Sequence, residues 1–364
     1  PDDFALPRDV SRWRSGFTTG TAATAAAMAA ADLLSGKPLP STVTVCLPSG
    51  QNLNVKVAGG SLINLDESVA IVVKDAGDDP DVTNGAEIGA IARRRSDKGL
   101  FYIIGGPGVG RVTKPGLAVK PGHWAINPGP MNMLKHNLKP LLNRPGLPGL
   151  EVEIFVEKGE ELAPKTLNPR LGIIGGISIL GSTGLVKPFS NEAYVATIES
   201  SLNQLTAMGR TEVIFTTGRQ SEKLISELRP DLAEENLVQV ADFFEASFKL
   251  AAERNMKTIG LAAFFGKTVK QAAGHAYTHA HHNDQDLVAL AEWLRPDITD
   301  QLRKELAEVV TARGALEILR EAGRLDLVEK GARPALNEAP HFTGPGPSIR
   351  LSVLDYYCTL LTKV

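Results

Sequence analysis

Residues 171–190, LGIIGGISILGSTGLVKPFS, are the part of the sequence from which we infer the fold. An apolar run, 171–174, is followed by glycines, and a helical pattern with Ser190 or Asn191 as its N-cap comes next. Open α/β sheets hold cofactors on such a strand, turn and helix, because glycines let the backbone approach a ligand and the helix N-terminus offers free N–H groups. The stretch predicts a cofactor-binding turn made by Gly175, Gly176, Gly181, Thr183 and Gly184.

The same turn argues against nucleotide hydrolysis. Gly176 to Thr183 has the spacing of a phosphate-binding P-loop, but Ser182 stands where the lysine should be. Without that lysine the loop lacks the charge that grips the β- and γ-phosphates. A tight turn that simply needs small residues remains an alternative interpretation.

Composition indicates a globular protein with two domains. The chain has 364 residues, 43% hydrophobic and 22% charged, and a net charge of −2, which argues against a nucleic-acid partner. Two cysteines give no disulfide framework and no thiolate metal site, which suits a cytoplasmic protein. The polar first sixteen residues and the lack of a long apolar run predict neither a signal peptide nor a membrane partner.

The second half of the chain alternates strand and helix patterns, which predicts a parallel sheet with helices on both faces. The loops after its strands should share one edge, where ligands bind: the glycine turn, 217–219, Asp242 and 265–267. The predicted strands are 171–174, 212–216, 237–241 and 258–264, and the predicted helices are 191–207, 221–228, 243–254, 268–274 and a helical stretch over 286–329.

The first half mixes both element types, and the tail returns to a strand. Residues 349–353 alternate apolar and polar, and after so many helices this strand most easily joins the sheet of the first region. We therefore predict an α+β domain, residues 1–169 with 331–364, interrupted by a Rossmann-like α/β domain with a parallel sheet, 170–330. Within the first region, helices are predicted at 22–31, 86–95 and 131–142, and strands at 43–47, 53–57, 69–73, 101–104 and 152–156.

Four carboxylates crowd the loop DAGDDPDVTNG, residues 75–85. Crowded carboxylates repel one another, so some should have a raised pKa suited to general-base chemistry. Asp78 and Asp81 flank the turn and are our catalytic candidates, beside Asp75 and Asp79. The alternative is that one acid caps the helix predicted next while the others are solvated.

Several basic and polar side chains suit an anionic substrate. Arg111 and Lys114 lie beside a glycine-rich loop. Four of the seven histidines fall between 275 and 282, but without an HExxH motif we expect a single ligand-facing histidine, His279, rather than a metal site, and we count it among the catalytic candidates. The substrate-binding candidates are Thr18, Thr19, Arg111, Lys114, Asn127 and Lys187.

Six strings carry a family resemblance. They are GFTTGTAATAAA from residue 16, KDAGDDPDVTNG from 74, GVGRVTKPGL from 108, AINPGP from 125, GGISILGSTGLVKP from 175 and GKTVKQAAGHAYTH from 266. Together they resemble the CbiD family, the cobalt-precorrin-5B C(1)-methyltransferases of the anaerobic route to cobalamin. Ala22 stands where the family often has cysteine and Ala280 where serine is usual, and neither residue is needed for methyl transfer.

The resemblance implies an enzyme with S-adenosylmethionine as methyl donor and a cobalt-bearing tetrapyrrole rich in carboxylates as acceptor. It implies cobalt only as part of the substrate, and it leaves a homo-oligomer open. The task of such an enzyme is mainly to align the ring carbon with the methyl group and to exclude water. The alternative is a non-catalytic tetrapyrrole- or nucleotide-binding protein that retains the fold.

Overall fold

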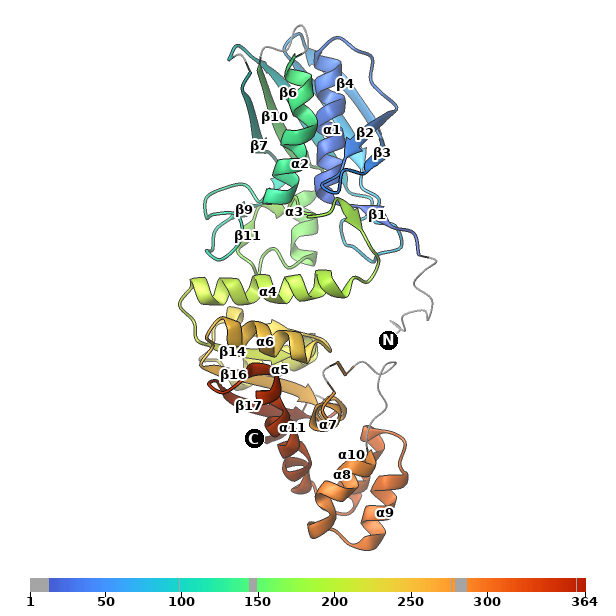
Figure 1. Cartoon of the computed structure of the whole chain (residues 1–364), viewed down its shortest axis with the longest axis vertical. Coiled ribbons are helices and arrows are strands. Elements are labelled where there is room, and N and C mark those ends of the chain that lie inside the picture. Colours follow the sequence, from blue (N-terminus) through green and yellow to red (C-terminus); the bar gives the residue numbers. More distant parts are fainter. Residues whose placement is uncertain (1–12, 98, 144–148, 276, 279–286, 358) are drawn as a thin grey trace. The chain divides into compact units, whose positions relative to one another are not determined.

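The computed structural model describes residues 13–97, 99–143, 149–275, 277–278, 287–357 and 359–364. The chain divides into two compact units, Pro1–Ser190 (unit 1) and Asn191–Val364 (unit 2), which are described separately (Figure 1). Helices and mixed sheets make up both units, so the predicted mixture of helices and strands in two domains is confirmed in this coarse form.

Unit 1 contains a five-stranded sheet with two helices against one face. Helix α1 (Thr19–Leu34) packs on β5 and β6, and α2 (Pro128–Leu138) lies beside α1 (Figure 1). Strand β10 runs antiparallel to β6 and parallel to β7, so the sheet is mixed. The strand order is β4 (Gly59–Asn64), β5 (Glu67–Val73), β6 (Glu87–Arg95), β10 (Gly149–Val156) and β7 (Phe101–Gly105).

The alanine-rich sequence of α1 explains its central position. Alanine is the best helix former, and its small side chain lets a helix lie close to a sheet. The alanines at 22, 23, 25–27 and 29–31 are all fully buried. Thr18 caps the helix, its Oγ1 accepting a hydrogen bond from Thr21 N at 3.2 Å. The predicted helix is confirmed.

The helix predicted at 86–95 is wrong, because these residues form β6. This strand pairs with β5 on one side and β10 on the other, so it is central in the sheet. Ile88, Ala90 and Ala92 alternate toward the buried face. Pairing on both sides outweighs the helix propensity of alanine and arginine.

Residues 171–190 also differ from the prediction, because they belong to unit 1 and open no strand of the second sheet. They form three two-residue strands, β11 (Ile173–Ile174), β12 (Gly176–Ile177) and β13 (Leu185–Val186). These pair with β9 (Arg111–Val112), β8 (Gly108–Val109) and β1 (Gly16–Phe17), respectively. A short apolar run predicts a strand but does not identify its partner.

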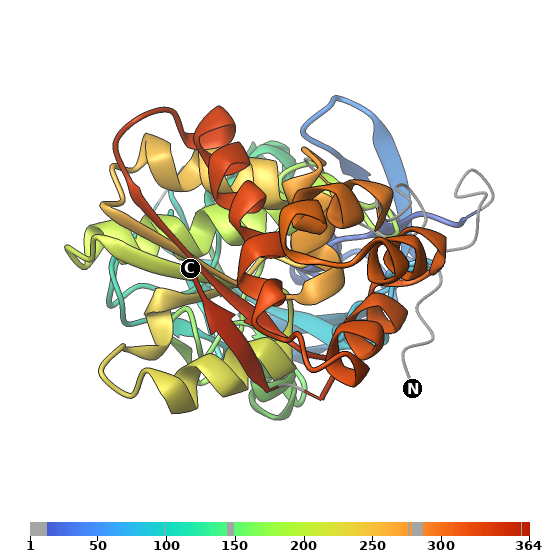
Figure 2. The same cartoon turned by 90° about the horizontal axis from the view of Figure 1, so that it is seen from below.

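Unit 2 has the predicted alternation of strands and helices. Four strands are parallel, in the order β15 (Leu237–Gln239), β14 (Glu212–Thr216), β16 (Thr258–Phe264) and β17 (Ser348–Leu354), and β18 (Leu360–Lys363) adds an antiparallel edge. Seen from below, α5 lies on one side of the strands and α6 and α11 on the other (Figure 2). The helices of the alternating part are α4 (Asn191–Ala207), α5 (Arg219–Leu228), α6 (Phe244–Glu253) and α7 (Phe265–Ala272).

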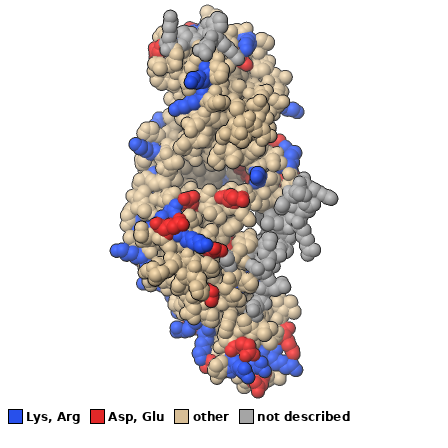
Figure 3. Space-filling view, viewed as in Figure 1, with Lys and Arg blue, Asp and Glu red and all other residues tan. Residues whose placement is uncertain are grey.

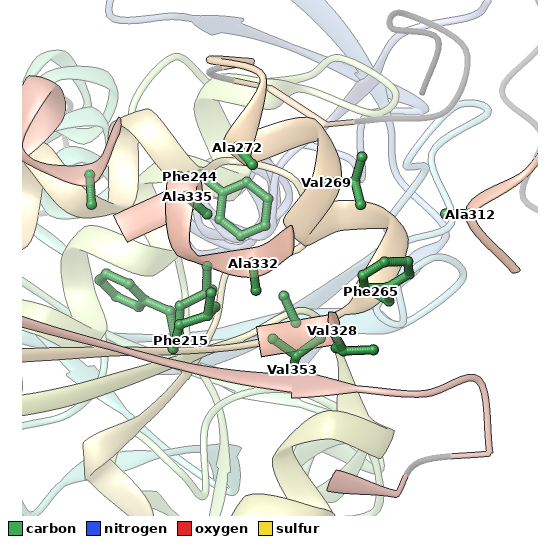
Figure 4. Packing of buried hydrophobic residues seen from close by; sticks show 14 of the residues in the cluster. Phe215, Phe244, Phe265, Val269, Ala272, Ala312, Val328, Ala332, Ala335 and Val353 are labelled. Atoms are coloured by element: carbon green, nitrogen blue, oxygen red, sulfur yellow. The ribbon is translucent and has the colours of Figure 1, made fainter. Parts of the chain in front are cut away.

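The larger core of unit 2 lies on the face covered by α4, α6, α7 and α11. Phe215, Phe244 and Phe265 are fully buried there beside Val328 and Val353 (Figure 4). Each buried side chain of this size contributes about 1.5–3 kcal/mol through the hydrophobic effect. The predicted helical stretch is present as α8 (Leu287–Leu294), α9 (Asp300–Glu308), α10 (Ala312–Glu321) and α11 (Leu327–Thr343).

The predicted place of the tail is wrong. Residues 349–353 are a strand, as expected, but β17 pairs in parallel with β16 over seven residues of unit 2. The two units therefore follow one another along the chain, and the insertion of 170–330 into a domain made of 1–169 and 331–364 is contradicted. Alternating polarity identifies a strand without specifying which open edge receives it.

The remaining elements are short. They are the hairpin β2 (Thr42–Cys46) and β3 (Asn52–Lys56), α3 (Gly159–Leu162), and the 3₁₀ turns Lys139–Asn143, Ala163–Lys165, Glu234–Asn236 and Arg295–Asp297. None of the helices in the described part of the chain has the length and apolar character needed to cross a membrane.

Candidate functional site

The glycine-rich loops of unit 1 meet at the N-terminus of α1, and we call this region the α1 junction (residues 14–21, 75–84, 108–127 and 172–187). Thr18 N donates to Gly184 O and Gly20 N donates to Leu180 O, both at 3.0 Å. Leu180 N donates to Thr19 Oγ1 at 2.9 Å. Five of the six strings that carry the family resemblance are therefore interlocked in one place.

Packing within unit 1 requires three of the four glycines among the five predicted cofactor-binding residues. A Cβ on Gly176 would lie 2.1 Å from Gly108 O, one on Gly181 2.3 Å from Thr18 Oγ1, and one on Gly184 2.7 Å from Leu47 Cδ2. Gly175 faces open space. Thr183 is exposed, and its Oγ1 donates to Leu185 O at 3.1 Å. The contact of these five residues with a cofactor stays a prediction. Their predicted position at the edge of the second sheet is wrong, because they lie in unit 1.

Thr18 and Thr19 are buried, 5% and 2% exposed, and their hydroxyls bond within the chain. Asn127 is the N-cap residue of α2, yet its side chain makes no capping hydrogen bond. Its backbone N donates to Ile179 O at 2.9 Å, which ties α2 to the junction. Of these three substrate-binding candidates, only Asn127 has its side chain available.

The acidic loop fastens neighbouring segments together. Asp75 binds the guanidinium of Arg14 and accepts from Gly77 N at 2.8 Å. These interactions, the Arg14 hydrogen bond foremost, lower the pKa of Asp75. Asp78 Oδ2 accepts from Arg14 N at 2.6 Å, and Asp79 Oδ1 accepts from Phe189 N at 2.9 Å.

Asp81 forms the most buried ion pair of this loop. Its Oδ2 lies 2.7 Å from Lys74 Nζ, and Lys74 is only 2% exposed. Its Oδ1 accepts from Thr83 N and Thr83 Oγ1, both at 2.7 Å. Burial alone would raise the pKa of Asp81, but the Lys74 charge and these hydrogen bonds outweigh it and lower the pKa. The raised pKa expected from carboxylate crowding is therefore wrong for Asp75 and Asp81.

Basic residues gather on the same unit. The guanidinium carbon of Arg111 lies 3.8 Å from the ring centre of Trp124, and Arg111 Nη1 donates to Gly122 O at 2.9 Å. Lys114 Nζ lies 3.4 Å from Arg170 O, and Lys187 is exposed. The cation–π contact holds the guanidinium of Arg111 at the surface.

The distribution of acidic residues along the sequence is a further signal, which the motifs did not show. Residues 98–150 contain no aspartate or glutamate. Blue side chains lie over α2 in the space-filling view, whereas both charge signs mix over α8–α10 (Figure 3). A segment with basic residues and no acids adds positive charge, which attracts anions. The basic residues of this segment are Lys98, Arg111, Lys114, Lys120, Lys135, Lys139 and Arg144.

A second candidate region is the carboxyl edge of the sheet in unit 2. Because β14, β15 and β16 are parallel, the loops that follow them meet there, as predicted. The chain leaves β14 toward β15 and then crosses back to β16. The topological switch point, where open α/β sheets bind ligands, therefore lies between β14 and β16.

Asp242 follows β15 at this edge. Its Oδ1 accepts from Thr278 Oγ1 at 2.7 Å and lies 3.1 Å from Lys267 Nζ. Lys267 also donates to Ala241 O at 3.3 Å. The carboxylate side chain is 13% exposed. Sequence reasoning placed Asp242 at the edge but not among the site residues, although an acid directly after the second parallel strand was a usable signal.

Three aromatic rings pack together beside Asp242, starting with Phe243, the next residue in the chain. Phe243 stacks on Tyr194 at 5.1 Å and meets Tyr277 at 5.1 Å, centre to centre. Burial, and after it the charge of Asp242, raises the pKa of both tyrosines. None of these three aromatic residues was predicted to belong to a site, because they are far apart in the sequence.

The predicted catalytic His279 lies outside the described residues. Among the residues that are described, no group of three or more His, Cys, Asp and Glu side chains could hold a metal ion. The catalytic role of His279 stays a prediction.

Comparison with known proteins covers both units. The family model CbiD matches residues 7–188. A cobalt-precorrin-5B C(1)-methyltransferase of Nitratidesulfovibrio vulgaris is 40% identical over 98% of this chain and 94% of its own, and one of Thermus thermophilus is 38% identical over 97% and 94%. A crystal structure of the cobalamin biosynthesis protein cbiD from Archaeoglobus fulgidus is 29% identical, covers 72% of this chain and 81% of its own, and has a TM-score of 0.41.

Proposed function

This chain belongs to the CbiD family, and from this premise we propose that it transfers a methyl group to carbon 1 of cobalt-precorrin-5B, giving cobalt-precorrin-6A in cobalamin biosynthesis. The main support for this proposal is the 40% identity to a cobalt-precorrin-5B C(1)-methyltransferase over nearly the whole length of both chains. In this proposal cobalt enters only as part of the tetrapyrrole substrate.

The proposed methyl donor is S-adenosylmethionine, and the residues at the edge of unit 2 fit it. The donor carries a ribose diol, an aromatic base and an amino-acid group with both charges. The edge offers a carboxylate, an ammonium group and aromatic rings, on Asp242, Lys267 and the Tyr194–Phe243 pair. The bound donor supplies an electrophilic methyl carbon. The chain's own task is to orient the reactants and exclude water.

The proposed acceptor site is on unit 1. A substrate rich in carboxylates is drawn to positive charge, and residues 98–150 carry basic residues without any acid. Guanidinium and ammonium groups form charge-assisted hydrogen bonds with carboxylates. Arg111, Lys114, Asn127 and Lys187 are proposed to make these contacts. Thr18 and Thr19 support the site by holding the α1 junction together.

Among the acids of unit 1, Asp78 is the one that we propose as a proton acceptor. It is exposed, and among the described residues its one hydrogen bond runs from Arg14 N to Oδ2. Asp81 is held by Lys74 and Thr83, which suits a positioning role rather than proton transfer. His279 remains a proposed catalytic residue on sequence grounds alone.

The direct test is turnover with cobalt-precorrin-5B and methyl-labelled S-adenosylmethionine, followed by mass spectrometry. The expected product gains one methyl group, and S-adenosylhomocysteine accumulates in equal amount. Binding of the tetrapyrrole without consumption of the donor would instead establish the carrier alternative. Asp78→Asn should lower turnover by about 10²–10⁴-fold if Asp78 moves a proton. The control is Asp66→Asn, which removes an exposed acid paired with Arg94 and should leave turnover unchanged.

A further inference from the structure

We infer that Asp242 accepts hydrogen bonds from the ribose diol of the methyl donor, whose base lies against the aromatic group of Tyr194, Phe243 and Tyr277. This inference rests on the proposed function, because it takes the donor to be S-adenosylmethionine. It assigns the nucleoside part of the donor to named residues of unit 2.

The first argument is the position of Asp242 in the sheet. In dinucleotide-binding α/β sheets, a glycine turn follows the first strand, and an acid about 20 residues further on binds the ribose hydroxyls. Here Gly218 follows β14, and Asp242 follows the adjacent strand β15, 24 residues later. The turn at Gly218 lacks the full glycine fingerprint, yet the two positions correspond.

Gly218 itself has no structural reason to be glycine. Its φ of 166° is extended and open to any residue. A Cβ placed there would meet no atom within 4 Å. The backbone at the N-terminus of α5 is therefore open for close approach, which is what a nucleoside at this turn requires.

Within the described part of the chain, the hydrogen bonds of Asp242 leave one of its two carboxylate oxygens available. Thr278 and Lys267 both bind Oδ1. Oδ2 has no hydrogen-bond partner among the residues that the structure describes, although the side chain is 13% exposed. Carboxylate oxygens shielded to this extent normally accept hydrogen bonds, so Oδ2, which has no partner in the described part of the chain, is a candidate acceptor for a ligand.

The charge of Asp242 also indicates which kind of group it binds. Lys267 already neutralises the carboxylate, so a second cation would be repelled by the lysine. A neutral hydrogen-bond donor, such as the two hydroxyl groups of a ribose, meets no such repulsion. Lys267 and Thr278 belong to the string from residue 266, so the part of unit 2 that resembles the CbiD family converges on this one carboxylate.

The aromatic group provides a surface for the base. Tyr194 is 37% exposed, and its ring stacks on Phe243 with an interplanar angle of 26°. Phe243 is the residue directly after Asp242, so the rings and the carboxylate share one place at the edge. Aromatic side chains stack on nucleobases whatever the base, since each base presents a π-face.

The experiment compares S-adenosylhomocysteine binding to the wild-type protein, Asp242→Asn and Asp355→Asn by calorimetry. Asp355 is a matched control, because it is a buried acid that follows β17 at the same edge. Its oxygens are occupied by Tyr357 N, Thr359 N and Arg320. Asp242→Asn should weaken binding by about 10- to 100-fold, as expected for lost hydrogen bonds to a charged acceptor, and Asp355→Asn should not.

The 2′-deoxy analogue of S-adenosylhomocysteine provides a test that needs no folded variant. The wild-type protein should bind it about 10-fold more weakly than the parent ligand, and Asp242→Asn should bind the two alike. Equal binding of both ligands by the wild-type protein would overturn the inference while the proposed function stands. A wild-type protein with neither S-adenosylhomocysteine binding nor turnover would overturn both.

Discussion

The acidic loop of unit 1 and the carboxyl edge of unit 2 use their carboxylates in opposite ways. In the loop, the carboxylates of Asp75 and Asp81 form ion pairs with Arg14 and Lys74 and accept hydrogen bonds from backbone N–H groups. At the edge, Asp242 keeps one oxygen free of partners within the described part of unit 2. The density of acids in a sequence therefore indicates charge, whereas the partners decide which acid is available to a ligand.

The glycines of the two regions differ in the same way. Gly181 of unit 1 has a φ of 126° and lies against Thr18, whereas Gly218 of unit 2 faces open space. The first glycine is required by the fold, and the second is free for a ligand.

Removing the charge of Asp81 should cause the largest loss of stability. Asp81→Asn leaves Lys74 buried without its counter-ion, and breaking such a pair costs about 3–5 kcal/mol. Denaturant unfolding followed by circular dichroism measures this loss. Asp79→Asn should cost less, because Asp79 accepts from the backbone N of Phe189 and leaves no buried lysine behind. An unchanged midpoint for Asp81→Asn would contradict the structural role.

Matched alanine substitutions should separate the two glycines. Gly181→Ala forces a Cβ against Thr18 in a left-handed backbone conformation, and overpacking of this kind costs about 1–3 kcal/mol. Gly218→Ala should leave the unfolding free energy almost unchanged and weaken S-adenosylhomocysteine binding instead. Loss of binding in folded Gly181→Ala, with none in Gly218→Ala, would move the donor site to unit 1.

How much the sequence predicts depends on the range of the interaction. Local patterns predicted the alanine-rich helix, the two strands β2 and β3, and the strand–helix alternation of unit 2. Pairing partners were not predictable, so 86–95 was assigned to a helix and the tail to the wrong sheet. The free oxygen of Asp242 depends on Lys267 and Thr278, which only the folded chain brings to it.

Acid should remove the stability that Asp81 contributes. Its pKa is lowered in the folded state, so the contribution is fully present above the ordinary value of 3.8 and is lost as the pH falls through the folded-state pKa. The unfolding free energies of the wild-type protein and Asp81→Asn should therefore converge below pH 3.8. A difference that stayed constant down to the lowest accessible pH would show that Asp81 titrates alike in both states.

Single basic residues of unit 1 should have the smallest effect. Arg111 is exposed, and one exposed ion pair is worth about 0.2–1 kcal/mol, so Arg111→Ala should raise the Michaelis constant for cobalt-precorrin-5B by about 1.4- to 5-fold. The turnover number should stay unchanged, because a contact made equally in the ground state and the transition state affects binding alone.

Salt distinguishes a charge effect from lost packing on Trp124. Added salt screens exposed charges, so the difference between the wild-type protein and Arg111→Ala should shrink as ionic strength rises. If Arg111 acted only by covering Trp124, the difference would be independent of salt. Lys304→Ala in α9 removes an exposed charge that is paired with Glu308, and as the control it should leave the Michaelis constant unchanged at every salt concentration. An equal response in both variants would mean that net charge, rather than the basic residues of the acid-free segment 98–150, attracts the substrate.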